Sequence, residues 1–77
     1  MVTAYLLLMV EAGQEEIAMN RLLEHDEVKE ANIVYGQYDI VAKVKVAEIK
    51  NLESFILKAI RPIREIQESS TLISTKE

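Results

Sequence analysis

The sequence contains no cysteine and no tryptophan, and it has only one histidine, one proline and two glycines among its 77 residues. Without cysteine there can be no disulfide, and a single histidine is too few for a zinc site built from clustered His and Cys. A chain of this length buries only roughly 60–65% of its unfolded surface. Small domains without disulfides or a metal often complete their core by association. We therefore expect an oligomer and no cofactor or metal.

Basic charge is also scarce, since nine Lys and Arg residues face thirteen Asp and Glu residues, for a net charge of −4. A nucleic-acid binder normally concentrates basic side chains along one surface, because neutralising phosphates supplies most of its affinity. The longest apolar run, residues 4–10, is far shorter than the roughly 20 residues that cross a bilayer. We expect a soluble, cytoplasmic, single-domain protein that binds neither nucleic acid nor membrane directly.

Hydrophobic periodicity predicts four strands and two helices in the order strand, helix, strand, strand, helix, strand. The third strand has the clearest alternation, because Ile40, Ala42 and Val44 share one face. The first strand instead carries apolar residues on both faces, which indicates a strand that is covered on both sides. The expected strands are residues 3–11, 29–35, 38–46 and 67–75, and the expected helices are residues 14–24 and 47–60.

The second predicted helix has apolar residues at the spacing of a helix that faces a core. Pro62 follows it and is expected to end it, and to keep Arg61 out of the helical conformation. The core-facing stripe consists of Ile49, Leu52, Phe55, Ile56, Ala59 and Ile60.

The last predicted strand is rich in serine and threonine, and we expect its Leu72 and Ile73 to point inward. Two interpretations of the hydroxyl side chains stay open at this point. They are either surface residues that favour extended structure or the lining of a polar pocket.

This element order is that of the ferredoxin-like α+β fold. Right-handed crossovers place both helices on one face of an antiparallel sheet with the expected strand order 4-1-3-2. Tyr5, Leu7 and Met9 of the first strand then point to the face that the helices do not reach. Because burial of such a side chain stabilises by roughly 1.5–3 kcal/mol, we expect a homodimer that covers this face. The alternative is a monomer with some exposed apolar surface.

A short segment with the sequence Tyr-Gly-Gln-Tyr-Asp, residues 35–39, joins the second and third strands. Gly36 stands where a tight reversal needs a permissive backbone, so the segment taken alone is consistent with an ordinary hairpin loop. The single histidine, His25, lies at the polar end of the first helix, where a solvated residue or a C-terminal cap is usual. No motif pairs it with a nucleophile, and we do not expect an enzyme.

The sequence resembles the effector-binding domain of the leucine-responsive (Lrp/AsnC) transcription regulators over essentially residues 1–77. The resemblance depends on Gly13 before the first helix, on Gly-Gln-Tyr-Asp-Ile-Val at residues 36–41, and on Ile-Gln-Glu-Ser-Ser-Thr at residues 66–71. The glycine-aromatic-aspartate block is the most specific part. The family more often has threonine where Ser69 stands. The resemblance implies a domain that dimerises through its sheets and assembles further into rings.

In this family the turn and the hydroxyl residues of the last strand help to form an effector site between neighbouring dimers. An amino-acid effector would place its ammonium on Asp39 and its carboxylate near the backbone of Gly36. The serine and threonine hydroxyls would bind either polar end. The effector-binding residues that the resemblance implies are Gly36, Gln37, Tyr38, Asp39, Ser69 and Thr71.

Full regulators of this family also carry an N-terminal helix-turn-helix, whereas this sequence begins directly on its first predicted strand. We therefore expect a stand-alone module, without a DNA-binding domain, that takes part in the regulation of transcription and amino-acid metabolism. A purely structural partner of full-length Lrp/AsnC regulators, without its own ligand, is the main alternative. A dimeric α+β barrel enzyme and an ACT-type amino-acid-binding module are further alternatives, the latter by analogy of fold only.

Overall fold

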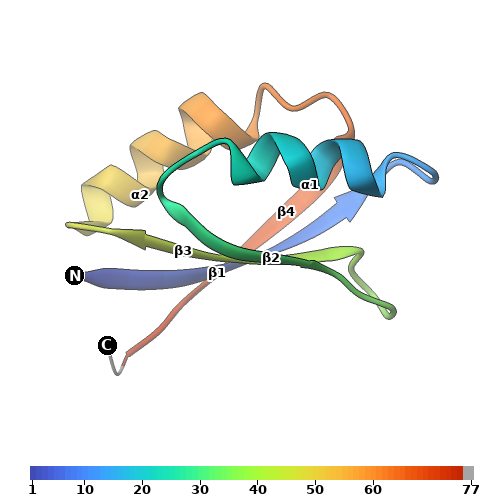
Figure 1. Ribbon diagram of the computed structural model, residues 1–77. Helices are drawn as coiled ribbons and strands as arrows, with labels where there is room; N and C mark the ends of the chain where they lie inside the picture. The colour runs from blue at the N-terminus through green and yellow to red at the C-terminus, as the bar shows by residue number, and fades with distance from the viewer. Residues whose placement is uncertain (76–77) are drawn as a thin grey trace.

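The computed structural model describes residues 1–75 and has the predicted order of elements (Figure 1). Most boundaries differ from the expected ones by one or two residues, and Tyr35 and Tyr38 lie outside the strands. The elements are β1 (Val2–Val10), α1 (Glu15–Leu23), β2 (Val28–Ile33), β3 (Ile40–Val46), α2 (Ile49–Phe55), the π-helix η1 (Ile56–Ile60) and β4 (Ile66–Ile73).

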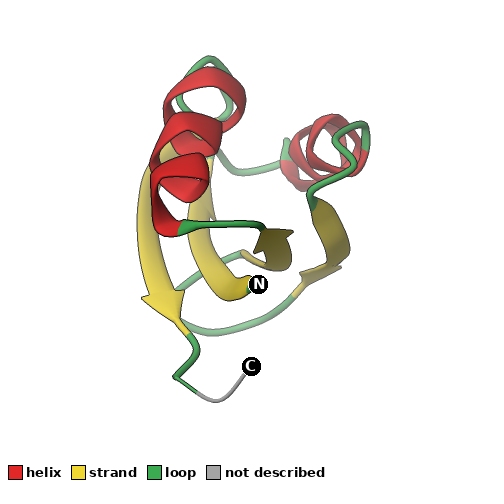
Figure 2. Cartoon of the chain, turned by 90° about the vertical axis from the view of Figure 1, so that its left-hand side faces the viewer, coloured by secondary structure: helices red, strands yellow, loops and turns green. Residues whose placement is uncertain are grey.

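The four strands form one antiparallel sheet in the order β2-β3-β1-β4. This is the predicted order 4-1-3-2 counted from the other edge, so the ferredoxin-like fold is confirmed. Both helices lie on the same face of the sheet, and no element of the described chain covers the opposite face (Figures 1 and 2). The pairing is irregular at two places, between Met9 and Val10 of β1 and between Val28 and Glu30 of β2.

The core fills the space between the helices and the sheet. In β1 and β3 every second residue points to the helices and is buried, as expected from the two-residue period of a strand. The helices contribute Ala18, Leu22, Leu52, Phe55, Ala59 and Ile60, and the sheet contributes Ala4, Leu6, Leu8, Val10, Val28, Ile40, Ala42, Val44 and Val46.

Three expectations about the second half of the chain were wrong. Ile49 is 50% exposed because it occupies the first turn of α2, at the end of the stripe. Leu72 and Ile73 are 53% and 45% exposed, because β4 is an edge strand and its neighbouring side chains point to opposite faces. Arg61 keeps helical angles, φ −60° and ψ −35°, before the proline. Its N–H donates to the carbonyl of Ile56 at 3.0 Å, which holds it in the last turn of η1.

Candidate functional site

The connection between β2 and β3 is an exposed reversal built on glycine. Gly36 has φ +135°, a region that residues with a side chain rarely adopt. Tyr35 beside it is fully exposed, Gln37 is exposed, and Tyr38 and Asp39 are half-buried. The predicted turn therefore exists, and its tip presents backbone groups and an aromatic ring to whatever approaches the domain.

Replacement of Gly36 by alanine is expected to lower the free energy of unfolding by about 1 to 3 kcal/mol, because an alanine at this φ is strained. An added Cβ would meet no atom within 4 Å, so the loss reflects backbone conformation and not a clash. Gln37→Ala in the same turn is the control and is expected to change stability by less than about 0.5 kcal/mol. Urea denaturation measures both, and equal midpoints for the two variants would contradict this account.

Asp39 is fixed at the end of β1 by hydrogen bonds from its side chain and its backbone. The N–H of Val10 donates to Oδ2 of Asp39 at 2.8 Å. The N–H of Asp39 donates to the carbonyl of Leu8 at 2.8 Å, and its own carbonyl accepts the N–H of Val34 at 2.8 Å. A carboxylate has about four acceptor positions, so the bond to Val10 orients the group and leaves acceptor capacity for a ligand.

The two predicted hydroxyl residues of β4 lie on the helix side of the sheet. Ser69 pairs with Leu8 and Thr71 pairs with Leu6, and both leucines belong to the core under the helices. Ser69 is exposed and Thr71 is half-buried, because β4 forms the edge of the sheet. Within a single copy of the chain both hydroxyl residues therefore lie along an open edge of the sheet.

The turn and the hydroxyls lie at the same end of the sheet but do not meet in one protomer. Ile40, Leu8 and Ser69 form one row across β3, β1 and β4. With two strand spacings between its ends, the row spans roughly 10 Å, and β1 lies in between. The six predicted site residues thus form two separate groups, residues 36–39 and the pair Ser69 and Thr71.

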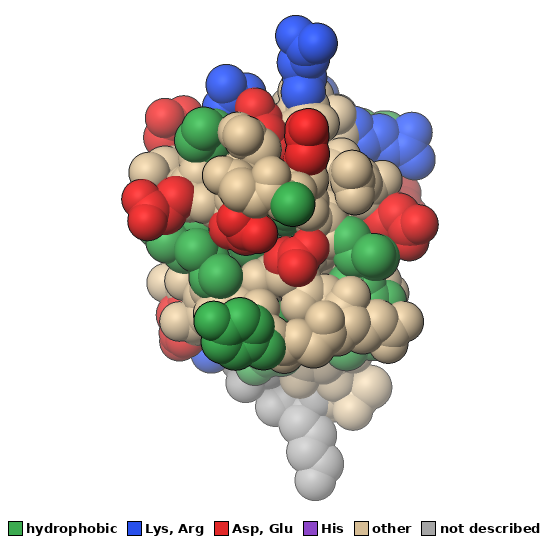
Figure 3. All heavy atoms as spheres, turned by 90° about the vertical axis from the view of Figure 1, so that its right-hand side faces the viewer, with side chains coloured by type: hydrophobic (Ala, Val, Ile, Leu, Met, Phe, Trp, Pro, Cys, Tyr) green, Lys and Arg blue, Asp and Glu red, His purple; other side chains and the backbone are tan. Residues whose placement is uncertain are grey.

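Carboxylate side chains are prominent at the end of the molecule that carries the turn (Figure 3). The basic side chains seen in this view lie mostly at its upper edge, toward the helices. Segments that begin or end here carry Glu11, Glu15, Glu16 and Glu68 in addition to Asp39. A ligand that approaches this end would therefore meet more acidic than basic groups.

The sheet face opposite the helices carries the apolar residues that the sequence placed there. Leu7 of β1 lies between Val41 of β3 and Ser70 of β4, and Tyr5 of β1 pairs with Leu72. Leu7 and Val41 are half-buried, whereas Tyr5 and Leu72 are exposed. We call the surface formed by Tyr5, Leu7, Met9, Val41 and Leu72 the open sheet face.

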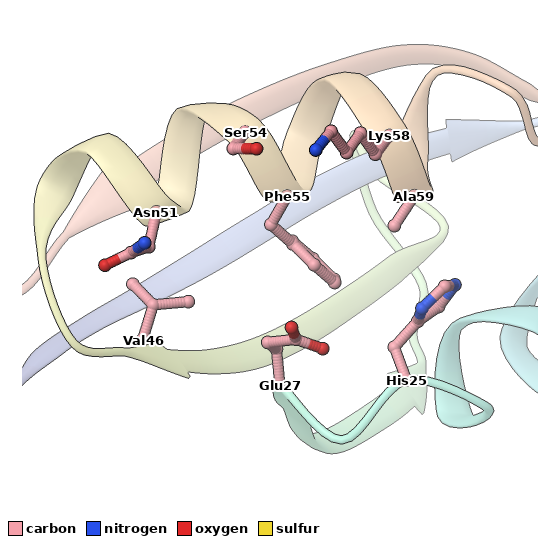
Figure 4. A pocket seen from close by; sticks show the side chains of 8 residues that line it. All are labelled: His25, Glu27, Val46, Asn51, Ser54, Phe55, Lys58 and Ala59. Atoms are coloured by element: carbon pink, nitrogen blue, oxygen red, sulfur yellow. The ribbon is translucent and has the colours of Figure 1, made fainter.

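A cavity of about 310 Å³ lies elsewhere, between α2 and the connection from α1 to β2 (Figure 4). We call it the α2 cavity. His25 was expected to be a solvated residue or a C-terminal cap. It is half-buried at the end of α1, where its N–H donates to the carbonyl of Leu22 at 3.1 Å, and its ring meets that of Phe55 edge-on at 5.6 Å between centroids. The residues that line the α2 cavity are His25, Glu27, Val46, Asn51, Ser54, Phe55, Lys58 and Ala59.

Sequence reasoning missed the α2 cavity, although one weak signal for it exists. Asn51, Ser54 and Lys58 follow one another at three- and four-residue spacing, so they line one flank of the helix beside its core stripe. His25 and Glu27 come from a connection far away in the sequence, and no spacing pattern could join them to that flank.

Residues 1–75 show neither a cluster of metal ligands nor a membrane-spanning helix. Within this part of the chain no three His, Asp or Glu side chains are placed to hold a metal ion together. None of its helices combines the length and the apolar character that a membrane span requires.

Comparison with known proteins identifies the family. The Lrp/AsnC ligand binding domain matches residues 3–77. The HTH-type transcriptional regulator FL11 of Pyrococcus abyssi (strain GE5 / Orsay) is 30% identical over 73 residues, which are 95% of this chain and 48% of that protein. This chain thus spans about half the length of that relative.

Two solved structures agree with the match. A hypothetical protein from Pyrococcus horikoshii, PHS023, is 47% identical with a TM-score of 0.94, and the match covers 100% of this chain and 93% of that one. E. coli AsnC is 31% identical with a TM-score of 0.93 over 99% of this chain and 52% of that one. The chain therefore belongs to the Lrp/AsnC family, and it is the ligand-binding domain of that family of transcriptional regulators.

Proposed function

We propose that this domain binds a free amino acid and conveys its presence to transcription through the assembly that the domain forms. The observation that carries the proposal is the geometry of Asp39. Its carboxylate is held by the N–H of Val10 at 2.8 Å, and it directly follows an exposed glycine turn. An oriented anion beside accessible backbone N–H groups suits a ligand that carries both an ammonium and a carboxylate.

Each predicted residue has a specific part in this proposal. Asp39 accepts hydrogen bonds from the ammonium group, and backbone N–H groups next to Gly36 approach the carboxylate. Tyr38, half-buried beside Asp39, offers an apolar wall with a polar tip, and the exposed Gln37 offers an amide. Ser69 and Thr71 then bind from a second copy, because within one copy they lie two strands away from the turn.

The assembly in this proposal has two kinds of contact. The open sheet face is covered by the same face of a second copy, which forms a homodimer. Dimers then meet through the β2–β3 turns, where Tyr35 projects fully into solvent, and close into a larger ring. A change in ligand occupancy between dimers would then alter the ring, and with it any full-length Lrp/AsnC regulator that joins the ring.

Replacement of Asp39 by asparagine is expected to weaken amino-acid binding at least about tenfold, because a charge-assisted hydrogen bond contributes roughly 1.5–3 kcal/mol. Asparagine keeps an oxygen for the N–H of Val10, so the fold is retained. Isothermal titration calorimetry across the twenty amino acids measures the change. L-Methionine is an early probe, since NMB0573 of Neisseria meningitidis, which has the same fold at 13% identity, was solved as a complex with L-Met.

The matched control is the other aspartate, Asp26, which is exposed in the connection between α1 and β2. Asp26→Asn is expected to leave the heats unchanged. An unchanged affinity in the Asp39→Asn variant would remove the assignment of the ammonium site.

One observation favours a second function, that of a structural partner without its own ligand. The two groups of predicted site residues stay apart within a protomer, and Asp39 already has a role in ending β1. If the wild-type protein gives no heat with any amino acid yet forms mixed assemblies with a full-length regulator, the structural function replaces the sensor. Whether the domain works without a helix-turn-helix of its own stays a prediction, which the mass of the protein purified from its source would test.

A further inference from the structure

We propose that the α2 cavity is a second ligand site, for a small zwitterion with an apolar part, and that it does not depend on the proposed site at Asp39. The two places lie at opposite ends of β3, since Asp39 directly precedes the strand and Val46 ends it. At about 3.3 Å per residue this separation is roughly 20 Å. A ligand in one site therefore does not touch the other.

The floor of the α2 cavity is apolar and belongs to the core of the domain. Val46, Phe55 and Ala59 are all buried core residues, and Figure 4 shows Phe55 and Ala59 projecting from the helix toward the sheet. The edge of the His25 ring packs against Phe55 at an interplanar angle of 88°. A cavity of about 310 Å³ is at the lower end of the range of small-molecule sites, so the floor accommodates one apolar side chain.

The rim carries one charge of each sign on opposite walls. Glu27 rises from the sheet side and Lys58 belongs to the helix side (Figure 4). Neither charge has an ion-pair partner among residues 1–75, where the ion pairs are Arg21–Glu65 and Lys50–Glu48. The carbonyl of Glu27 accepts the N–H of Lys45 at 2.9 Å, which ties this wall to β3.

Neutral polar groups complete the rim on the helix side. Oδ1 of Asn51 accepts the N–H of Glu48 at 3.0 Å, which orients the amide and leaves its NH₂ group as a donor. The hydroxyl of Ser54 lies one turn further along α2, and it can donate or accept. Together with Lys58, these groups offer donors for a carboxylate, while Glu27 offers the acceptor for an ammonium.

The π-helix η1 shapes the same wall. In a regular α-helix Ile60 would point about 140° away from Phe55. The wider turn, closed by the bond from Arg61 N–H to Ile56 C=O at 3.0 Å, reduces that angle, so Ala59 and Ile60 are both buried beneath the helix. Such turns are rare and frequent at functional sites, which supports a site at this wall.

The charges decide the class of ligand. A simple carboxylate would pair only with Lys58 and a simple amine only with Glu27, so each would leave one charge of the rim without a partner. A phosphate ester would find only one permanent cation, Lys58, at the rim. A molecule that carries both an ammonium and a carboxylate can pair with Glu27 and with Lys58, and its apolar part occupies the floor.

The chain supplies two unique reporters for this site, because it has one histidine and one phenylalanine, and both line the cavity. The experiment records the imidazole proton signals of His25 and the fluorine signal of 4-fluorophenylalanine at position 55 by NMR. The probes are L-leucine, L-methionine and L-phenylalanine, each titrated to roughly 10 mM. We expect a saturable shift of both reporters with at least one probe.

Variants and analogues make the test specific. Glu27→Gln and Lys58→Met are each expected to weaken the binding seen by the reporters at least tenfold, while Asp39→Asn leaves it unchanged. 3-Phenylpropionate and 2-phenylethylamine, which lack the ammonium or the carboxylate of L-phenylalanine, are expected to bind at least tenfold more weakly than L-phenylalanine itself.

Three results would overturn the proposal: no shift in the wild-type protein with any probe, shifts that persist in both charge variants, or shifts that vanish in Asp39→Asn. A failure of the α2 cavity proposal can be distinguished from a failure of the proposed function. The NMR reporters measure binding at the α2 cavity, whereas calorimetry of the Asp39→Asn variant measures binding at the site around Asp39. Circular dichroism checks that the variants are folded, and Glu27 and Lys58 lie on the rim and not in the core.

Discussion

Replacement of Leu7 by lysine is expected to convert the proposed homodimer into a monomer of 8.8 kDa. Leu7 lies at the centre of the open sheet face, between Val41 and Ser70 on the neighbouring strands. In a dimer formed through this face, both copies would lose an apolar contact worth roughly 1.5–3 kcal/mol and bury a charge instead. The dissociation constant should therefore rise by at least about a hundredfold.

Light scattering coupled to size-exclusion chromatography measures this change at several protein concentrations. Leu57→Lys is the matched control, since Leu57 is 55% exposed on η1 and belongs to the helix layer. It should keep the mass of the wild-type protein. A wild-type protein that runs as a monomer, or a Leu7→Lys variant that stays dimeric, would contradict the role of the open sheet face.

Replacement of Leu22 by alanine is expected to lower the free energy of unfolding by roughly 2–5 kcal/mol, because it removes a fully buried side chain and leaves a cavity. Leu22 is 0% exposed in the core beneath α1. A domain of this size has only about 5–15 kcal/mol of stability in total, so a substantial fraction of the variant should be unfolded at 37 °C.

The adjacent leucine is the control for this second prediction. Leu23 is 47% exposed on the outer side of the same helix, and Leu23→Ala should cost less than about 1 kcal/mol. Urea denaturation followed by circular dichroism compares the two variants at one fixed protein concentration, because association contributes to the stability of an oligomer. Equal losses for the two variants would mean that the assigned core of α1 is wrong.

The fold was predictable from the sequence because its pattern is local and regular. The alternation of β3 places Ile40, Ala42 and Val44 under the helices, and these residues are fully buried in the structure. The order of elements and the handedness of the crossovers then leave few topologies. The hydrophobic pattern alone could not predict burial where it depends on which strands and helices pack beside a residue. Leu72 is apolar and was therefore expected to point inward, but it lies on the edge strand β4 and is exposed.

The candidate sites were less predictable, for a different physical reason in each case. The turn at Gly36 was found because glycine marks its backbone conformation, whereas the bond between Asp39 and Val10 joins residues that are 29 positions apart. The π-helix η1 is closed by the hydrogen bond from Arg61 N–H to Ile56 C=O, and no periodicity in the sequence predicts that bond. The α2 cavity depends on the way His25 meets Phe55, which only the packed structure defines.

The two edge strands, β2 and β4, determine whether further strands can pair with this sheet. β2 exposes Lys29 and Glu30 and its pairing is interrupted beside them, and β4 exposes Gln67 and Glu68 near its start. Ionic side chains and irregular pairing discourage further strands from adding at a rim. Copies of the protein are therefore not expected to join edge to edge into one continuous sheet, which leaves the open sheet face and the β2–β3 turns for the contacts proposed above.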